Sequence, residues 1–178
     1  MCGGRGSRFE ADVEKPLFPV GDRPMVDRVR DALVASRINT VHAVVSPQAP
    51  ATRDHLDDIS TIQTPGNGYV ADLEAALVDV PKPVLTVAAD LPLLDGPAID
   101  TVLDDHADGP MTVAVPAALK RQLGVSLEES LPDPGEELAP AGVNVVADGV
   151  ESTHTTYDAR FAVNVNRRSD VAVAEALL

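Results

Sequence analysis

The first residues of the chain have the types and spacing of a phosphate-binding loop. Glycines stand at positions 3, 4 and 6, and Arg5 and Arg8 lie among them. Glycine lets the backbone adopt a positive φ, so that several N–H groups can converge on one anion. Arginine can hold a phosphate through two parallel hydrogen bonds. The stretch therefore indicates an anion site, with a purely structural glycine-rich turn as the alternative.

Two common phosphate-binding motifs are absent from this stretch. The Walker pattern, G-x-x-x-x-G-K-[ST], and the dinucleotide pattern, G-x-G-x-x-G, do not match. Lys15 follows instead in Glu14-Lys15-Pro16, and Gly21 begins the stretch G-D-R-P-M that ends at Met25. The whole spacing resembles the signature of nucleotidyltransferases with a molybdenum-cofactor guanylyltransferase-like or sugar-nucleotide pyrophosphorylase-like domain.

This resemblance implies roles for the first residues of the chain. In such enzymes the glycine loop and its arginine wrap a nucleoside triphosphate, and the lysine neutralises charge on the phosphates in the transition state. Attack on an α-phosphorus needs positioning and charge stabilisation more than a nucleophilic side chain. The resemblance assigns triphosphate binding to the loop residues Gly3, Gly4, Arg5 and Gly6. It assigns catalysis to Arg8, to Lys15 and to the later Asp90.

Three later stretches narrow the resemblance. They are residues 64–73 (TPGNGYVADL), 140–146 (PAGVNVV) and 161–166 (FAVNVN). Together they resemble the archaeal-type adenosylcobinamide-phosphate guanylyltransferases over essentially the whole chain. This implies transfer of GMP from GTP to adenosylcobinamide phosphate with release of pyrophosphate, in cobalamin biosynthesis or salvage. A molybdopterin guanylyl- or cytidylyltransferase of the same fold stays open, as does a non-catalytic, nucleotide-binding regulatory subunit.

The same resemblance implies a second group of site residues. Asp90 would hold Mg²⁺, since a hard carboxylate suits a cation that bridges phosphates. The other positions would face the nucleotide or the corrinoid: Gly66, Gly68, Tyr69, Gly142, Asn144 and Asn164. Each position has a structural alternative. The glycines can serve tight turns, the asparagines can satisfy backbone groups at strand ends, Tyr69 can be packing, and Asp90 can cap a turn.

Apolar runs alternate with amphipathic segments along the chain. The apolar runs predict strands at 40–46, 84–89, 111–115 and 142–147, and the helical patterns predict helices at 24–36, 69–80, 97–106 and 169–178, the last capped by Ser169. This alternation predicts one α/β domain over residues 1–178, a three-layer Rossmann-like fold with a mostly parallel sheet. Ligands bind such sheets beyond the carboxyl ends of the strands. The acidic, proline-containing segment 119–140 interrupts the alternation, as a lid or as a solvated loop.

The composition restricts the partners and the surroundings. The net charge is −14, with 28 acidic and 14 basic residues, and only three of the basic residues are lysines. A protein whose surface is acidic throughout stays hydrated in molar salt. We therefore expect this protein to function in a salt-rich cytoplasm. The absence of a basic stripe argues against nucleic acid, and the apolar runs are too short for a membrane span. Cys2, the single cysteine, excludes an internal disulfide. The expected partners are small-molecule substrates, with a homodimer as an open alternative.

The position of the glycine loop raises one further expectation. In the resembling enzymes a short apolar strand delivers the chain to this loop, whereas here the loop begins at residue 2. A strand in the interior of a sheet leaves unpaired backbone groups on both neighbours if it is missing. We therefore expect the first strand of the fold to be missing from this sequence, and Met1 to stand where that strand ends.

Overall fold

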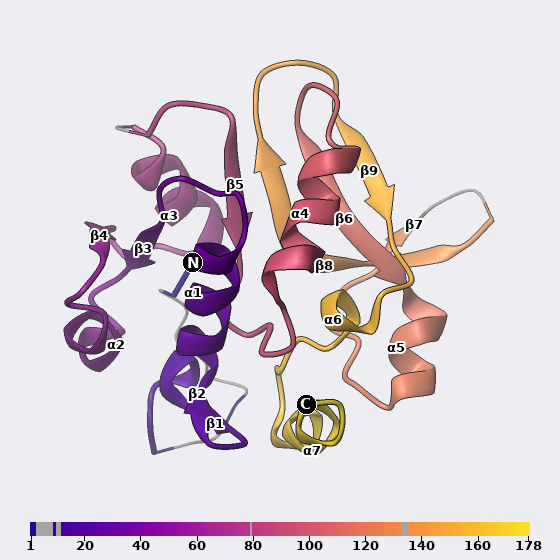
Figure 1. The fold of residues 1–178 in the computed structure, drawn as a ribbon, viewed down its shortest axis with the longest axis horizontal. Helices are drawn as coiled ribbons and strands as arrows, with labels where there is room; N and C mark the ends of the chain where they lie inside the picture. Colours follow the sequence, from indigo (N-terminus) through magenta and orange to yellow (C-terminus); the bar gives the residue numbers. More distant parts are fainter. Residues whose placement is uncertain (3–8, 10–11, 79, 133–134) are drawn as a thin grey trace.

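Strands and helices alternate along the chain, as the sequence predicts (Figure 1). The computed structural model describes residues 1–2, 9, 12–78, 80–132 and 135–178. Its helices are a 3₁₀ turn at Lys15–Leu17 (η1), α1 Met25–Ala35, α2 Pro50–His55, α3 Tyr69–Ala76, α4 Gly96–Asp105, α5 Ala117–Leu123, α6 Ala159–Ala162 and α7 Arg168–Ala176. Its strands are β1 Pro19–Val20, β2 Arg23–Pro24, β3 His42–Val45, β4 Ser60–Gln63, β5 Val84–Val87, β6 Met111–Pro116, β7 Leu131–Pro132, β8 Glu137–Val146 and β9 Ser152–Thr155.

The strands of the described residues form three hydrogen-bonded sheets. The five-stranded sheet has the order β5-β8-β6-β9, with β7 paired on β8. In it β8 runs antiparallel to both β5 and β6, and β9 runs parallel to β6. A second sheet pairs β3 with β4 in parallel, and β1 and β2 form a small antiparallel ribbon. The predicted α/β fold is confirmed, with β8 as the strand that reverses direction.

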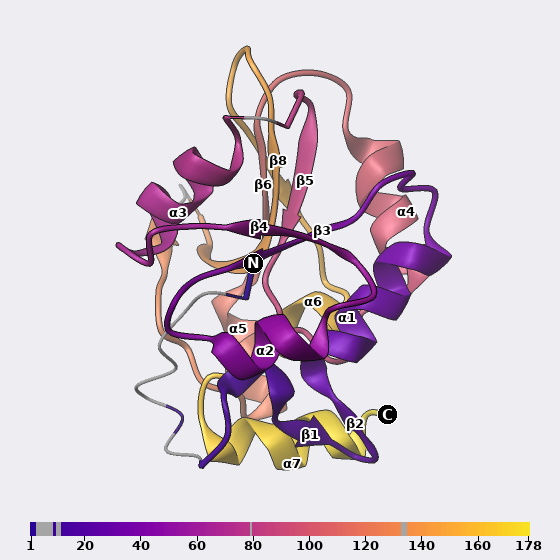
Figure 2. The same ribbon diagram turned by 90° about the vertical axis from the view of Figure 1, so that its left-hand side faces the viewer.

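One face of the five-stranded sheet carries the main core. On β8 the residues alternate, so that Ala141, Val143 and Val145 are buried while Gly142 and Asn144 lie on the other face. The buried face packs against Ile99 and other apolar residues of α4 and α1. Figure 2 shows α4 and α3 on opposite sides of β5, β6 and β8. The second face, which carries Gly142 and Asn144, is therefore the side of the sheet available to a ligand.

Two expectations about the second half of the chain need correction. Helix α7 is not capped by Ser169, which lies inside its first turn; the N-cap is Arg167, whose backbone N–H donates to Asp170 at 2.8 Å. The segment 119–140 is not a solvated loop throughout, because it contains the end of α5, strand β7 and the first residues of β8. The alternation of buried and partly exposed residues on β8 begins only at Ala139, and the acidic residues before it gave no sign of a strand. Within the described part of the chain, no helix is long and apolar enough to cross a membrane.

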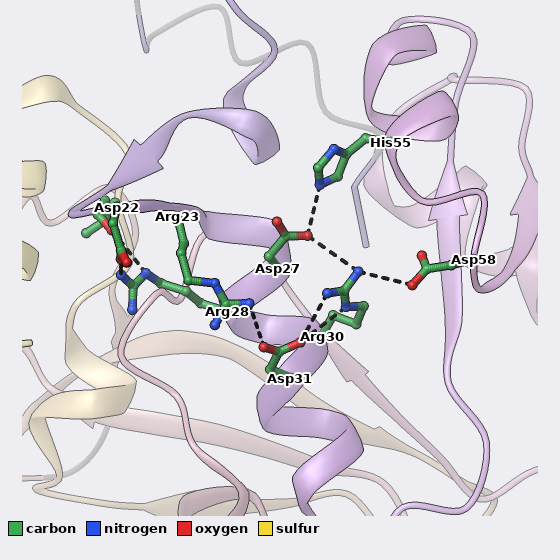
Figure 3. A network of polar contacts seen from close by, with 9 residues as sticks. Asp22, Arg23, Asp27, Arg28, Arg30, Asp31, His55 and Asp58 are labelled. Carbon is green, nitrogen blue, oxygen red and sulfur yellow. Dashed lines mark hydrogen bonds and ion pairs between the residues drawn. The ribbon is translucent and has the colours of Figure 1, made fainter.

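A network of charged side chains joins α1 to the segment around α2 (Figure 3). Arg30 on α1 lies 3.6 Å from Asp27, 3.2 Å from Asp31 and 3.4 Å from Asp58. His55 at the end of α2 contacts Asp27 at 2.9 Å. Such pairs near the surface each contribute about 0–1 kcal/mol at most. They orient α1 against α2, but they compensate little of the repulsion within a chain of net charge −14.

Salt should therefore stabilise the fold. The 28 acidic residues are in excess over the 14 basic ones, so screening weakens the repulsion among them more than it weakens the ion pairs at the surface. We expect the melting temperature to rise by several degrees when the KCl concentration is raised from about 0.1 M to about 1 M. Over this range the Debye length falls from about 10 Å to about 3 Å. Scanning calorimetry in KCl and in choline chloride measures this, since screening does not depend on the identity of the cation. A melting temperature that stays flat or falls in both salts would contradict the expectation.

Candidate active site

The candidate site is centred on Lys15, which the sequence predicts to be catalytic. Its ammonium donates to Asp90 Oδ2 at 2.5 Å and to Asn166 Oδ1 at 3.0 Å. The Lys15 and Asp90 side chains are 17% and 18% exposed, so both charges are largely removed from water while one edge stays accessible. The fold thus brings together residues that lie 75 and 151 positions apart in the chain.

The glycine-loop residues Gly3, Gly4, Arg5, Gly6 and Arg8 lie outside the described residues. Their predicted role in holding a triphosphate stays a prediction.

The neighbours of Lys15 in the Glu-Lys-Pro motif fix its position. Glu14 does not face Lys15; its carboxylate accepts from the backbone N–H groups of Ala51 and Thr52 at 2.9 and 2.7 Å and from the Thr52 hydroxyl at 2.6 Å. These bonds satisfy free N–H groups in the first turn of α2. Pro16 is buried in η1. The motif therefore ties the backbone on both sides of Lys15 to the body of the protein.

Asp90 follows the carboxyl end of β5. Its backbone carbonyl accepts from Val165 N–H at 2.9 Å, which joins it to the segment between α6 and α7. Asp90 Oδ1 is buried and has no hydrogen-bond partner among the described residues. A buried carboxylate oxygen without a donor is costly and calls for an explanation. Its free lone pairs are available to a cation.

A second lysine, Lys120 on α5, contacts the same segment between α6 and α7 as Lys15. It is 2% exposed, and its ammonium donates to the Ala162 carbonyl at 2.7 Å and to Asn164 Oδ1. Burial lowers the pKa of Lys120, and the carboxylates of Asp170 and Asp90 oppose that shift. Lys120 therefore holds the first part of the segment whose Asn166 contacts Lys15.

Asp170 fixes the other end of that segment. Its carboxylate accepts from the backbone N–H groups of Ser126, Asn166 and Arg167 at 2.8–2.9 Å and from the Ser126 hydroxyl at 2.7 Å. Burial alone would raise the pKa of Asp170, but the hydrogen bonds from Ser126, Arg167 and Asn166 outweigh it and hold the pKa below its ordinary value. The side chain is completely buried. Asp170 thus sets the direction of Asn166 toward Lys15.

The structure places the β8 residues at different distances along β5 from Asp90. Gly142 has a φ of +77°, and its carbonyl accepts from Ala88 N–H at 2.8 Å, two residues before Asp90. A Cβ on Gly142 would lie 3.0 Å from the Ala88 Cβ, so a side chain is disfavoured there by both strain and space. Asn144 pairs with Thr86, which lies two residues further than Ala88 from Asp90. Gly142 therefore borders the candidate site, and Asn144 lies on the same face at a greater distance.

The residues predicted to face the base and ribose lie at the start of α3. Gly66 and Gly68 have positive φ values of 75° and 109°, and Tyr69 is half exposed. The Gly66 N–H donates to Asp72 Oδ1 at 2.8 Å, and its carbonyl accepts from Gln48. These residues follow the carboxyl end of β4, whereas Asp90 follows β5, and no contact joins them among the described residues. Their proposed role needs a ligand that spans this part of the sheet edge.

Three residues of the site were missed in the sequence. Lys120 carried a signal, because it is one of only three lysines and lies in an apolar helical pattern. Asn166 follows Asn164 at strand spacing, so both side chains could have been expected on one side. Asp170 carried no recognisable signal, since an acidic residue early in a helix is usual. No group of three or more His, Cys, Asp or Glu side chains forms a metal cluster within the described residues.

Replacing Asp170 by Asn should destabilise the fold in a pH-dependent way. The folded-state pKa of Asp170 is lowered, so its contribution is present above the unfolded pKa of about 3.9 and is lost as the pH falls through the folded pKa. We expect Asp170→Asn to lower the free energy of unfolding at pH 7 by about 1–3 kcal/mol, because amide hydrogens cannot replace the lost acceptor. Urea unfolding between pH 7 and pH 3 measures the difference, which should narrow at the acid end. Asp57→Asn, at an exposed position, is the control; an equal effect of both variants would contradict the assignment.

Comparisons with known proteins identify the family of this chain. The chain is 29% identical to adenosylcobinamide-phosphate guanylyltransferase of Methanocaldococcus jannaschii, with 100% of this chain and 95% of the relative covered. It is also 29% identical to the bifunctional protein GlmU of Carboxydothermus hydrogenoformans, of which it covers only 25%. Among solved structures, a putative glucose-1-phosphate thymidylyltransferase from Bacillus anthracis superposes with a TM-score of 0.67 at 13% identity, covering 99% of this chain and 92% of that one. The family model described as the MobA-like NTP transferase domain matches residues 1–139. The chain therefore belongs to the MobA-like NTP transferase family and is a nucleotidyltransferase.

Proposed function

We propose that this chain transfers GMP from GTP to adenosylcobinamide phosphate, giving adenosylcobinamide-GDP and pyrophosphate. The observation that supports catalysis is the contact of Lys15 with Asp90 and Asn166 at the carboxyl end of β5. The similarity to the M. jannaschii enzyme, over the whole length of both chains, supports this acceptor. The substrates are small molecules.

The proposed reaction needs no nucleophilic side chain. A phosphate oxygen of the acceptor attacks the α-phosphorus of GTP, and the bond from that phosphorus to the bridging oxygen breaks, so that pyrophosphate leaves. Negative charge grows on the α-phosphate and on the leaving oxygen. Lys15 supplies the matching positive charge from a position fixed by Glu14 and Asn166, so little reorganisation is needed.

The residues present fit a Mg²⁺ ion. Mg²⁺ is usually held by one or two carboxylates together with substrate phosphates, and Asp90 offers a buried Oδ1 with free lone pairs. When bound, the ion would neutralise phosphate charge. In the proposed site Asp90 would hold Mg²⁺, and Lys15 would supply positive charge to the phosphates. The presence of both residues argues against a regulatory subunit that binds nucleotide without catalysis.

Pyrophosphate release tests the proposed function directly. The purified chain, in high KCl with Mg²⁺, is incubated with GTP or CTP and with adenosylcobinamide phosphate or molybdopterin. We expect release with GTP and adenosylcobinamide phosphate only. Release only with molybdopterin would show that molybdopterin, and not adenosylcobinamide phosphate, is the acceptor. Release with none of the pairs would favour a non-catalytic regulatory subunit.

Lys15→Ala should slow the reaction by about 10²–10³-fold, because it removes one preorganised positive charge from the transition state. The measurement is kcat for pyrophosphate release with the native pair of substrates. Lys82→Ala is the matched control, since the Lys82 side chain is 42% exposed and, among the described residues, pairs with Asp148 at 2.8 Å. Turnover of the Lys15 variant within a few-fold of the control would contradict the proposed role.

A further inference from the structure

Two asparagine side chains face the candidate site from the segment between α6 and α7. In this segment Val163 and Val165 are completely buried. Asn164 and Asn166 alternate with them and are only half-buried. Because successive residues of an extended segment point to opposite sides, the two asparagines share the outward side. The contact of Asn166 with Lys15 places that side at the candidate site.

Two lysines determine how the two amide groups are turned. Asn164 Oδ1 accepts from the Lys120 ammonium, and Asn166 Oδ1 accepts from the Lys15 ammonium at 3.0 Å. An ammonium has three donors and no acceptor, so only the oxygen of each amide can face it. The NH₂ group of each asparagine therefore points away from its lysine.

Both NH₂ groups are available to a ligand. Neither amide nitrogen donates to another of the described residues, and neither is among their buried polar atoms that lack a partner. Both nitrogens therefore reach the surface. An NH₂ group offers two N–H donors and no acceptor. Such donors fit the oxygens of an anion, whereas Mg²⁺ binds the oxygen of an amide, which here faces a lysine.

The two sides of β5 distinguish between the anions of the proposed reaction. On one side residues 1–2 bond to β5, and the glycine stretch predicted to hold the triphosphate follows them in the sequence. On the other side β5 pairs with β8, and α6 packs against β8 and β6 (Figure 1). The segment with the two asparagines continues from α6. In-line transfer needs the attacking and leaving oxygens on opposite sides of the phosphorus, so the asparagines lie on the side of the attacking group.

We propose that the side-chain NH₂ groups of Asn164 and Asn166 bind the phosphate group of the acceptor, whose oxygen attacks the α-phosphorus. This inference rests on the proposed function and names the residues that hold its nucleophile. The two amides bind terminal oxygens of the acceptor phosphate and leave another terminal oxygen free to attack. Because these donors are neutral, they bind the phosphate more weakly than lysine or arginine would and withdraw less of its negative charge. The phosphate is thereby oriented and stays nucleophilic.

Asn164→Asp tests this assignment, because it replaces the NH₂ group by an oxygen and keeps an acceptor for Lys120. We expect KM for adenosylcobinamide phosphate to rise about 10–100-fold, since a hydrogen bond to a charged group is lost. KM for GTP and the melting temperature should stay those of the wild type. Asn39→Asp, at an exposed position, controls for the added negative charge.

The same variant separates donation from the other roles of an asparagine. A carboxylate would serve as well as an amide if Asn164 only accepted from Lys120 or bound Mg²⁺ through its oxygen. An unchanged KM for the acceptor would therefore overturn the proposal. A rise in KM for GTP alone would also overturn it, because it would assign the amide to the nucleotide.

A binding measurement on the wild-type chain separates this inference from the proposed reaction. The side-chain NH₂ signal of Asn164 is followed by NMR during titration with inorganic phosphate and, separately, with MgCl₂, with the signal of Asn39 as the reference. We expect a saturable shift with phosphate and none with MgCl₂. A shift with MgCl₂ alone, or with neither, would overturn the proposal. If phosphate shifts the signal but no pair of substrates releases pyrophosphate, the proposed function fails and the phosphate site stands.

Discussion

The proposed site depends on one contact, the ammonium of Lys15 against the carboxylate of Asp90. Two opposite charges that are each less than one-fifth exposed stabilise each other in surroundings where either alone would be costly. The contact is also the point where the N-terminal part of the chain meets the end of β5. A triphosphate would compete with Asp90 for the lysine, and a cation would take the place of the lysine at Asp90. In the proposed reaction, this contact would hold both groups in place before substrate binds.

The segment between α6 and α7 supplies Asn166, which contacts Lys15, and buried side chains hold this segment in place. Lys120 binds its first part through Ala162 and Asn164, and Asp170 binds Asn166 at its far end. Burying these polar groups costs free energy of desolvation, and their hydrogen bonds offset that cost. The segment is therefore held by a cation and an anion on either side of the site. Such fixed surroundings are what electrostatic stabilisation of a transition state requires.

Much of this could be predicted from the sequence, because it depends on local patterns. The apolar runs located β3, β5, β6 and the end of β8, and the Glu-Lys-Pro motif located Lys15. Strands β4 and β9 are short and carry polar residues such as Ser60 and Ser152, so no apolar run marks them. The contacts of Lys120 and Asp170 join positions more than 40 residues apart, and no local pattern can express them. The antiparallel course of β8 likewise follows from packing and not from its own residues.

A structure of the chain with Mg²⁺ and a GTP analogue whose α,β bridge cannot be cleaved tests the central claim most directly. We expect the triphosphate at the carboxyl end of β5, with Lys15 Nζ about 3 Å from a phosphate oxygen and Asp90 facing the cation. A triphosphate bound elsewhere, with the Lys15 to Asp90 contact of 2.5 Å unchanged, would contradict it.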